Sequence, residues 1–494
     1  MATTQPNILL ITTDQQRFDA AGGAGPRFLR TPHFDQLRRE GLTFTSAYAD
    51  CPSCVPSRVS IMTGQFVTSH GMARNGQTST VMGRERTLPA YMRALGYQTA
   101  AIGKMHFGPQ RLRHGFDEMI LPDDYYREMI RRGASLQPMR HGLGQNELYP
   151  TMATVPESQT LTNWIAEQCL EYIRVRRDPT VPFFLWCSFS KPHPPLDPPE
   201  PYYSMYRGCA IAEPVYGDWS DDEHCPYALK RGRQAQSYDL LPPEIIREAR
   251  SAYYGLITQI DYNLGRIFAG LQDVDLFNET LILYTSDHGE YLGDHHMGSK
   301  GFFHEPSAHV PFVLRPPRSW DRRAQGTTVG DLATLADILP TLVTAAGGTP
   351  SADCDGQDLL AAARGELDQP RRHLEFLLGG APALTRGARP LPASIGLTDG
   401  RWKYLWYPQG GAEQLFDLGA DPLECHNLAG IPAFAGQAET LRQELVRRHQ
   451  DRSSAAVADG RLVARPVPDD TVADRRSRSW AGYHTEYTDV DVRH

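Results

Sequence analysis

Asn7-Ile-Leu-Leu-Ile-Thr-Thr-Asp14-Gln15 is a short apolar and β-branched run that stops at a carboxylate and an amide. Such a run predicts a buried strand, here over Ile8–Thr12. Three later segments repeat the pattern of a predicted strand followed by polar side chains: Gln98–Ile102 before Lys104 and His106, Phe183–Phe189 before Lys191 and His193, and Leu281–Thr285 before Asp287 and His288.

Helical patterns lie between these strands, over Leu161–Val175 and from about Pro243 to Leu271. Alternating strands and helices predict an α/β fold, with a large, mostly parallel central sheet flanked by helices on both faces. In open sheets of this kind, ligands bind beyond the carboxyl ends of the strands. If the four strands run parallel, their polar ends meet at one edge, and we expect the functional site there.

The pattern changes near residue 370, where short strands separated by turns are followed by an amphipathic helix over about 432–448. Because 494 residues exceed one ordinary core, we expect more than one domain. The predicted division is a catalytic α/β domain over 1–370, a smaller C-terminal α+β domain with an antiparallel sheet over 371–452, and a polar tail over 453–494.

Two stretches, 107–155 and 194–242, are rich in Pro and Tyr and poor in periodicity. Long irregular loops are commonly functional. We interpret them as walls of a substrate pocket, and the alternative is that they are surface insertions without a role in recognition.

Charge and composition exclude several partners. The net charge of −8 is mild for this length and no long basic run occurs, so we expect no nucleic-acid partner. We expect no membrane partner and a cytoplasmic protein, because no apolar stretch approaches a membrane span and the N-terminal segment lacks secretory-signal features. The eight cysteines are scattered, which favours free thiols.

One cysteine stands in an unusual context, Cys54-Val-Pro-Ser-Arg58, with Thr63-Gly64 following. Pro56 suits a first helical turn, so Ser57–Met62 is predicted as a helix that Gly64 ends. Cys54 would then lie beside a helix N-terminus, which favours an anion or a thiolate. Two other interpretations remain: a redox dithiol with Cys51, and a buried inert cysteine.

Taken together, these motifs resemble the signature of the sulfatase family, which is part of the alkaline-phosphatase-like superfamily. The resemblance covers nearly the whole chain and rests on the order and spacing of several elements. They are the strand ending at Asp14, Cys54-Val-Pro-Ser-Arg58 with Thr63-Gly64, Gly103-Lys104-Met-His106, Ser286-Asp287-His288-Gly289 with Lys300, Trp402-Lys403-Tyr404, and Leu415-Phe-Asp417 through Glu424 to Asn427-Leu428.

The resemblance implies a sulfuric ester hydrolase in which a formylglycine-generating enzyme oxidises Cys54 to formylglycine, the nucleophile. It also implies one divalent metal held by Asp14, Gln15, Asp287, His288 and the residue derived from Cys54. Oxygen ligands favour Ca²⁺, and the histidine admits Mn²⁺, with Mg²⁺ as a further candidate. The substrate would be a small-molecule sulfate ester.

The resemblance assigns further roles around the nucleophile. Arg58, Lys104 and Lys300 would share the negative charge of the transferring group. His193 with Lys300 would protonate the leaving oxygen, and His106 would help to release sulfate.

Two residues depart from the commonest family pattern. Gln15 stands where many members carry aspartate, and His288 where many carry asparagine. Both are similar to the phosphonate monoester hydrolase branch, so hydrolysis of phosphonate monoesters or phosphodiesters is the alternative activity. The alternative outside enzymes is an inactive binding protein that keeps Cys54 unmodified.

Several other residues each allow a functional and a purely structural interpretation. Asn75 would contact substrate or serve as a turn residue. Asp294-His295-His296 and His304 would hold a second metal or, more simply, form solvated loops, and Glu305 would support Lys300 or form a surface pair. Trp480, Tyr483 and Tyr487 lie among arginines in the tail, so we expect a tail that docks on a neighbouring subunit of a homo-oligomer or on its own domain.

Overall fold

An eight-stranded sheet is the centre of the computed structural model, which describes residues 5–76, 86–133, 141–144, 146–236, 238–320, 325–379, 392–452 and 454–468. The strand order is β4-β3-β5-β1-β6-β7-β2-β8. The strand bounds are β1 Asn7–Asp14, β2 Leu42–Tyr48, β3 Gln98–Gly103, β4 Glu118–Ile120, β5 Phe183–Pro192, β6 Thr280–Ser286, β7 Phe312–Arg315 and β8 Thr327–Thr334.

The four strands expected from the sequence are neighbours in this sheet and run parallel, in the order β3-β5-β1-β6. Their register places Gly103 opposite Ser188 and Thr13 opposite Ser286, so the polar ends of these strands lie together. Only β7 is antiparallel to its neighbours in the described part of this sheet. The predicted fold class is therefore confirmed.

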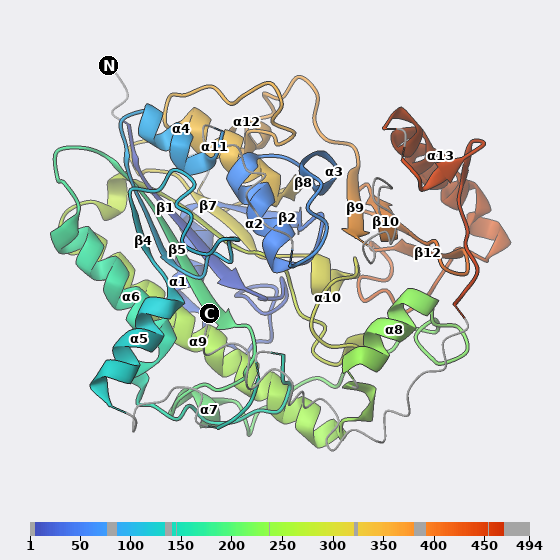
Figure 1. Cartoon of the computed structure of the whole chain (residues 1–494), viewed down its shortest axis with the longest axis horizontal. Helices are drawn as coiled ribbons and strands as arrows, with labels where there is room; N and C mark the ends of the chain where they lie inside the picture. Colours follow the sequence, from blue (N-terminus) through green and yellow to red (C-terminus); the bar gives the residue numbers. More distant parts are fainter. Residues whose placement is uncertain are drawn as a thin grey trace.

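Helices cover both faces of the sheet (Figure 1). Alternate residues of each strand point to opposite faces, so Leu10 and Trp186 lie in one apolar core and Ile11 and Cys187 in the other. The helices that contribute to the first core are α2 Cys54–Thr63, α4 Leu88–Ala94, α11 Ile338–Ala345 and α12 Leu359–Ala363. Those of the second core are α1 Pro32–Glu40, α5 Pro122–Arg132, α6 Leu161–Glu171 and α9 Pro243–Asp273.

A second, four-stranded antiparallel sheet follows near the C-terminus, in the order β12-β11-β10-β9. Its elements are β9 Leu374–Gly379, β10 Pro392–Thr398, β11 Trp402–Tyr407, β12 Ala412–Asp417 and helix α13 Ala435–Asp451. Along β11, Tyr404 and Trp406 face the core under α13, whereas Leu405 and Tyr407 face a core shared with the large domain. The smaller antiparallel sheet is confirmed, and the division at residue 370 stays a prediction.

The stretches 107–155 and 194–242 contain more regular structure than the sequence indicated. The first holds β4 and α5, and the second holds α7 Tyr202–Met205 and α8 Tyr227–Gln236. The amphipathic pattern of α5 buries Tyr125 and Met129, a signal that we missed among the prolines and tyrosines. Their role as pocket walls stays a prediction.

The start of the tail lies on its own domain. Strands β13 Val457–Ala458 and β14 Arg461–Leu462 form a hairpin, and the N–H of Arg465 donates to the Pro408 carbonyl at 2.8 Å. The aromatic residues Trp480, Tyr483 and Tyr487, on which the expected oligomer contact rests, lie outside the described residues. None of the described helices, the 31-residue α9 included, is long and apolar enough to cross a membrane.

Candidate active site

Cys54 is the first residue of helix α2, at the edge where the parallel strands end. The helix begins earlier than Ser57, because Ser53 is already in extended backbone and Pro56 fits inside the first turn. At the other end, Gly64 takes the left-handed conformation (φ 67°) and its N–H donates to the Ser60 carbonyl. The fully buried Cys54 side chain is therefore held at a helix N-terminus, where negative charge is favoured.

The two cysteines of the Cys51–Cys54 pair are free thiols in opposite environments. Burial and Asp50 raise the pKa of Cys51 well above its usual value, and its Sγ faces the Ala73 carbonyl. For Cys54, burial and Asp14 also favour a higher pKa, but the positive charges of Lys300, Lys104 and His288 outweigh these two effects. The net result is a pKa of Cys54 well below its usual value. This asymmetry favours Cys54 alone as the reactive residue.

Two buried carboxylates, Asp14 at the end of β1 and Asp287 just after β6, face Cys54 and are bridged by Arg58. Arg58 Nε donates to Asp287 Oδ2 at 3.0 Å, and Nη2 donates to Asp14 Oδ2 at 3.2 Å. Its Nη1 donates to Ser188 Oγ at 2.9 Å and to the Lys104 carbonyl. The guanidinium thus uses its donors to fix the two carboxylates and two strand ends.

His288 completes the group of possible metal ligands. Its Nδ1–H donates to the Gly289 carbonyl at 3.0 Å, so Nε2 is the ring atom that faces Cys54 Sγ, at 3.2 Å. One ligand atom from each of Asp14, Cys54, Asp287 and His288 lies within 4.8 Å of the others.

The donor set fits a divalent cation. Burial and the neighbouring Asp14 raise the pKa of Asp287, and a cation bound between the two carboxylates would favour their ionised forms. Two carboxylates and one imidazole match the ligands that Ca²⁺, Mg²⁺ or Mn²⁺ take in proteins.

Gln15 lies beside this group in the left-handed region (φ 73°), which is uncommon for a residue with a side chain. Its N–H donates to Asp287 Oδ1 at 3.1 Å, and its carbonyl accepts from the Tyr253 hydroxyl at 2.7 Å. The side-chain Oε1 accepts from Lys300 Nζ at 2.5 Å, and Nε2 donates to the buried Glu290. A strained backbone conformation persists where the surrounding contacts hold the residue in place, and these four hydrogen bonds hold Gln15 in this way.

Lys104 follows β3, and its ammonium lies 2.7 Å from Asp14 Oδ2. Gly103 precedes it at φ 103°, where a side chain would collide with the Ser188 carbonyl, so glycine is required for β3 to end against β5. Burial opposes the charge on Lys104, but Asp14 and Cys54 raise its pKa above the usual value. Its side chain remains 17% exposed, so the cluster is open at this point.

His193 and Lys300 form a second pair close enough to act on Cys54. His193 Nδ1 donates to the Pro194 carbonyl at 2.8 Å, so Nε2 is the atom that accepts from Lys300 Nζ at 3.1 Å. Burial, Lys300 and Lys104 hold the pKa of His193 well below its usual value, so the ring is neutral beside the ammonium. An anion in the site would offset the two lysines and favour the protonated ring.

The structure therefore brings Asp14, Gln15, Cys54, Arg58, Lys104, His193, Asp287, His288 and Lys300 together. Two other predicted site residues, His106 and Asn75, are not part of this group of contacts. The side chain of His106 is exposed, and the described contacts do not connect it to Cys54. Asn75 is also exposed, and its Oδ1 accepts from the Val55 N–H at 3.0 Å and from Ser53 Oγ, which holds the start of α2.

Two residues of this region were missed by sequence reasoning. Ser188 joins Thr12, Arg58 and the Lys104 carbonyl at the end of β5. Glu290 orients Gln15, and its place three residues after Asp287 was a signal that could have identified it. A serine at a strand end is too common to carry such a signal.

His295 and His304 are buried structural groups and His296 is half-buried, so the prediction of solvated loops was wrong. Asp294 forms ion pairs with Arg17 and Arg250, and His304 bonds to the Tyr291 hydroxyl and to Gln414 Oε1. Among the described residues, the group around Cys54 is the candidate metal cluster that the geometry yields, and these histidines are outside it.

Glu305 has neither of the two roles predicted for it, support of Lys300 or an ion pair on the surface. It is buried and bonds to Lys403 at 2.6 Å and to His309 at 2.6 Å, so it is neither a support for Lys300 nor a surface pair.

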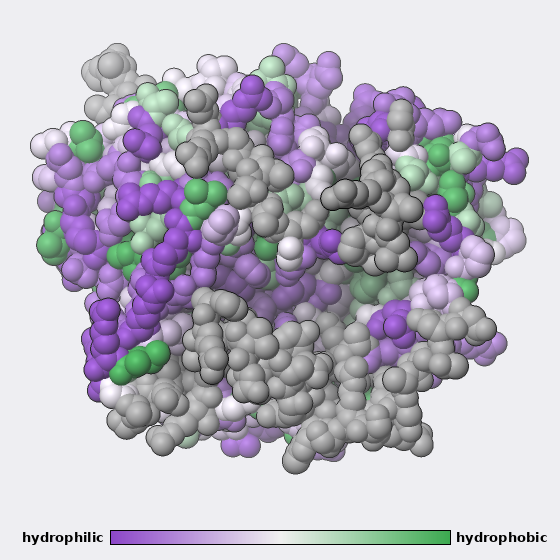
Figure 2. Space-filling model, in the orientation of Figure 1, coloured by the Kyte–Doolittle hydropathy of each residue, from purple (hydrophilic) through white to green (hydrophobic). Residues whose placement is uncertain are grey.

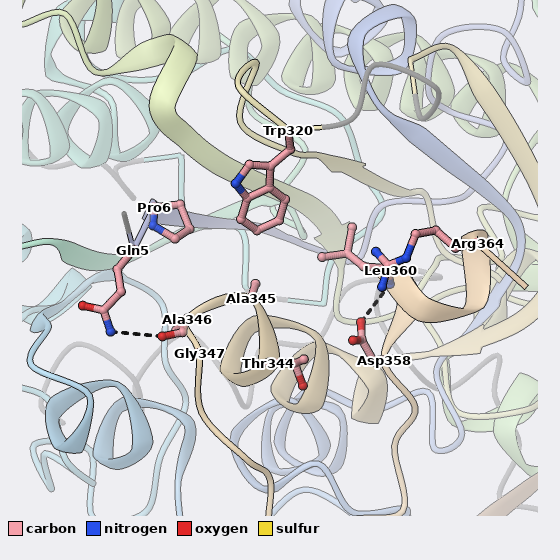
Figure 3. Close-up of a pocket in the computed structure, with 10 residues that line it drawn as sticks. All are labelled: Gln5, Pro6, Trp320, Thr344, Ala345, Ala346, Gly347, Asp358, Leu360 and Arg364. Carbon is pink, nitrogen blue, oxygen red and sulfur yellow. Dashed lines mark hydrogen bonds between the residues drawn. The ribbon is translucent and has the colours of Figure 1, made fainter. Parts of the chain in front are cut away.

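Figure 2 shows a largely hydrophilic recess near the centre of the view of Figure 1. A separate cavity of about 260 Å³ lies at the amino end of β1, lined by residues that include Gln5, Trp320, Asp358 and Arg364 (Figure 3). It contains none of the predicted site residues, and ligands of parallel sheets bind at the opposite, carboxyl end. We assign it no role.

Comparisons with known proteins agree with the geometry. A family model described as Sulfatase matches residues 6–348, and a model described as N-sulphoglucosamine sulphohydrolase, C-terminal, matches residues 293–451.

Individual relatives cover almost the whole chain. It is 32% identical to an arylsulfatase of Clostridium perfringens, covering 95% of this chain and 99% of that protein. It is 30% identical to a multifunctional alkaline phosphatase superfamily protein of Trinickia caryophylli, covering 91% and 97%. Among solved structures, a phosphonate monoester hydrolase from Silicibacter pomeroyi superposes with a TM-score of 0.78 at 25% identity, covering 90% of this chain and 96% of that chain.

Proposed function

Because the chain belongs to the sulfatase family, within the alkaline-phosphatase-like superfamily, we propose that it hydrolyses small-molecule sulfate esters through a nucleophile derived from Cys54. The observation that carries the proposal is the position of Cys54. It starts helix α2 among two carboxylates, an imidazole and two lysines, at the carboxyl edge of the sheet. This arrangement suits a nucleophile that attacks an anionic group.

Formylglycine, once formed from Cys54 and hydrated by addition of water to its aldehyde, would supply the hydroxyl that attacks sulfur. Asp14, Gln15, Asp287 and His288 would hold a divalent cation, with Ca²⁺ favoured and Mn²⁺ or Mg²⁺ as alternatives. Such a cation would supply a Lewis acid that neutralises the sulfate and lowers the pKa of that hydroxyl.

The cationic residues have two different roles. Arg58 is saturated by Asp14, Asp287, Ser188 and the Lys104 carbonyl, so its role is to hold the carboxylates against each other. Lys104 and Lys300 keep ammonium groups at the edge of the cluster, where they would bind sulfate oxygens.

The leaving oxygen would receive its proton from the His193–Lys300 pair. With Nδ1 committed to the Pro194 carbonyl, His193 presents Nε2 to the site, and Lys300 Nζ is within hydrogen-bond distance of that atom. Anionic substrate would offset the lysines and favour protonation of Nε2 before transfer. His106 stays our candidate for assisting sulfate release, and Asn75 for a substrate contact through its amide nitrogen.

Hydrolysis of phosphonate monoesters or phosphodiesters is the second candidate. It is favoured by the amide at Gln15, the imidazole at His288, and the similarity to a phosphonate monoester hydrolase over most of both chains. The same nucleophile and metal ligands would serve both reactions.

One experiment tests both candidates. The enzyme is produced together with a formylglycine-generating enzyme, and the mass of the Cys54 peptide gives the fraction converted. Turnover of a paired aryl sulfate and aryl phosphonate monoester is then measured. We expect a higher kcat/KM for the sulfate, proportional to the converted fraction, and Cys54→Ala as an inactive control. Turnover that does not follow conversion contradicts the nucleophile, and preference for the phosphonate reverses the order of the candidates.

Three further expectations stand as proposals. Maturation would require contact with a formylglycine-generating enzyme, the protein would act in the cytoplasm, and the tail over 453–494 would dock on a neighbouring copy in a homo-oligomer. Truncation after residue 468 followed by light scattering tests the last of these, and an unchanged oligomer or a monomeric full-length chain contradicts it.

A further inference from the structure

We propose that Glu290 is a positioning residue that fixes the orientation of the Gln15 side-chain amide, with Oε1 directed to Lys300, away from Glu290, and available as a ligand to the metal site. This inference rests on the proposed function, because it assigns Gln15 as a metal ligand. Glu290 itself is not part of the metal-ligand group among the described residues, so it would act through Gln15.

The orientation of the Gln15 amide follows from donor and acceptor chemistry. Lys300 Nζ can only donate, so the Gln15 atom 2.5 Å from it must be Oε1. The other end of the amide contacts Glu290 Oε2, where a carboxylate accepts from the Nε2 hydrogens. Each contact excludes the flipped amide, which would set donor against donor at Lys300 and oxygen against oxygen at Glu290.

Glu290 is itself held rigidly. Its Oε1 accepts from the Leu292 N–H at 2.9 Å, and its backbone N–H donates to the Pro306 carbonyl at 2.8 Å. Its side chain is 1% exposed. Both carboxylate oxygens are therefore committed, one to the backbone and one to Gln15, and a fixed acceptor transmits its geometry to the side chain that it binds.

Glu290 also explains why residue 15 carries an amide and not the carboxylate of an aspartate. A carboxylate there would face the Glu290 carboxylate across a hydrogen-bond distance in a buried site, which is strongly unfavourable. Glutamine keeps an oxygen ligand for the cation and offers hydrogens to Glu290. Glutamine in place of the commoner aspartate is therefore explained by the carboxylate of Glu290 beside it.

A double-mutant cycle on metal affinity tests the proposal without measuring turnover. The full-length chain is stripped of metal, and the Kd for Mn²⁺ and for Ca²⁺ is measured by competition with a fluorescent chelator. We expect Glu290→Met and Gln15→Ala each to weaken binding, by roughly 10- to 100-fold for a residue that orients a ligand. In the Gln15→Ala background, Glu290→Met should weaken binding by less than about threefold further.

Controls separate positioning from charge and from folding. Glu375→Met removes another buried carboxylate, in the small sheet, and should leave the metal Kd unchanged. Melting curves in chelator report folding, and Glu290→Gln, which keeps one acceptor, replaces Glu290→Met if that variant does not fold.

Unchanged binding in the folded Glu290 variant overturns the proposal, and so does an equal loss in both backgrounds, which would indicate a charge effect. If wild-type chain and Gln15→Ala bind metal equally, the ligand assignment fails. If the wild-type chain binds neither cation, the metal-dependent function proposed above fails as well.

Discussion

Two buried clusters of charge lie at opposite ends of the segment 287–305. The first surrounds Cys54 with Asp14, Asp287, Arg58 and Lys104. The second joins Lys403 of β11 to Glu305 and to Glu424 in the C-terminal part of the chain. Lys403, Asp14 and Asp287 are wholly buried and Arg58 is nearly so, and burial alone therefore does not distinguish the clusters.

Their difference lies in closure. Each of the three N–H donors of Lys403 Nζ has an acceptor: the Phe303 carbonyl at 2.8 Å, Glu305 at 2.6 Å and Glu424 at 2.8 Å. Glu424 Oε2 also accepts from the Glu305 N–H. Around Cys54, by contrast, ligand atoms converge on one point, and Lys104 retains an exposed part. The closed cluster joins the small antiparallel sheet to Glu305, whereas an open and convergent cluster can bind a ligand.

The largest expected effect is at the centre of the open cluster. Cys54→Ala removes the nucleophile but little packing, so we expect kcat on aryl sulfate to fall by about 10⁴-fold or more with the fold intact. Steady-state kinetics and circular dichroism measure the two quantities. Cys51→Ala should retain turnover. If it is as damaging as the Cys54 change, the redox dithiol interpretation returns.

Lys403→Met breaks the closed cluster and should act on stability. It leaves Glu305 and Glu424 buried without their counter-ion, which costs about 3–5 kcal/mol in the free energy of unfolding. Urea unfolding measures this cost.

Lys104→Met is the matched control in the open cluster, because it also removes a lysine paired to a buried carboxylate. We expect it to lower kcat/KM by about 10²- to 10³-fold while costing less stability than Lys403→Met. If the two lysine variants lose stability and activity in the same proportion, the distinction between the clusters is wrong.

His193→Ala sharpens the assignment within the open cluster. A general acid contributes most when the departing oxygen is basic, so we expect a loss of about 10²-fold with alkyl sulfates and a smaller loss with nitrophenyl sulfate. The measurement is kcat/KM across a leaving-group series. A uniform loss across the series would assign His193 to sulfate positioning only.

The smallest expected effect concerns the pH dependence of the closed cluster. Burial raises the pKa of Glu424 from 4.5 to about 7 in the folded protein, whereas Lys403 and His309 overcome burial and lower that of Glu305 to about 2. The unfolded chain thus releases the Glu424 proton first as pH rises, so the stability contributed by Glu424 falls between pH 4.5 and about 7. The contribution of Glu305 is present above pH 4.5 and is lost toward pH 2.

Glu424→Gln should therefore flatten the pH dependence of the free energy of unfolding between pH 5 and 7, by on the order of 1–3 kcal/mol. Urea titrations of the wild type and the variant at matched pH give the difference directly. Parallel curves for the two proteins would show that Glu424 is ionised throughout this range.

The sequence alone predicted the elements whose signals are local. Apolar runs ending in polar residues located β1, β3, β5 and β6, and their alternation with helices gave the parallel sheet and its functional edge. The Cys54 motif located α2 to within three residues. These features could be predicted because periodicity, capping and strand-end position are properties of neighbouring residues.

Tertiary structure decided which of those polar residues meet. Gln15 and Glu290 bond across 275 positions of sequence, Arg58 is saturated by groups from four strand ends, and Glu305 pairs with Lys403 and not with Lys300. His295 and His304, expected in solvent, are buried against Trp219 and the small sheet. Such pairings depend on how two sheets pack and on which donors remain unsatisfied once they do, and no local pattern in the chain encodes that balance.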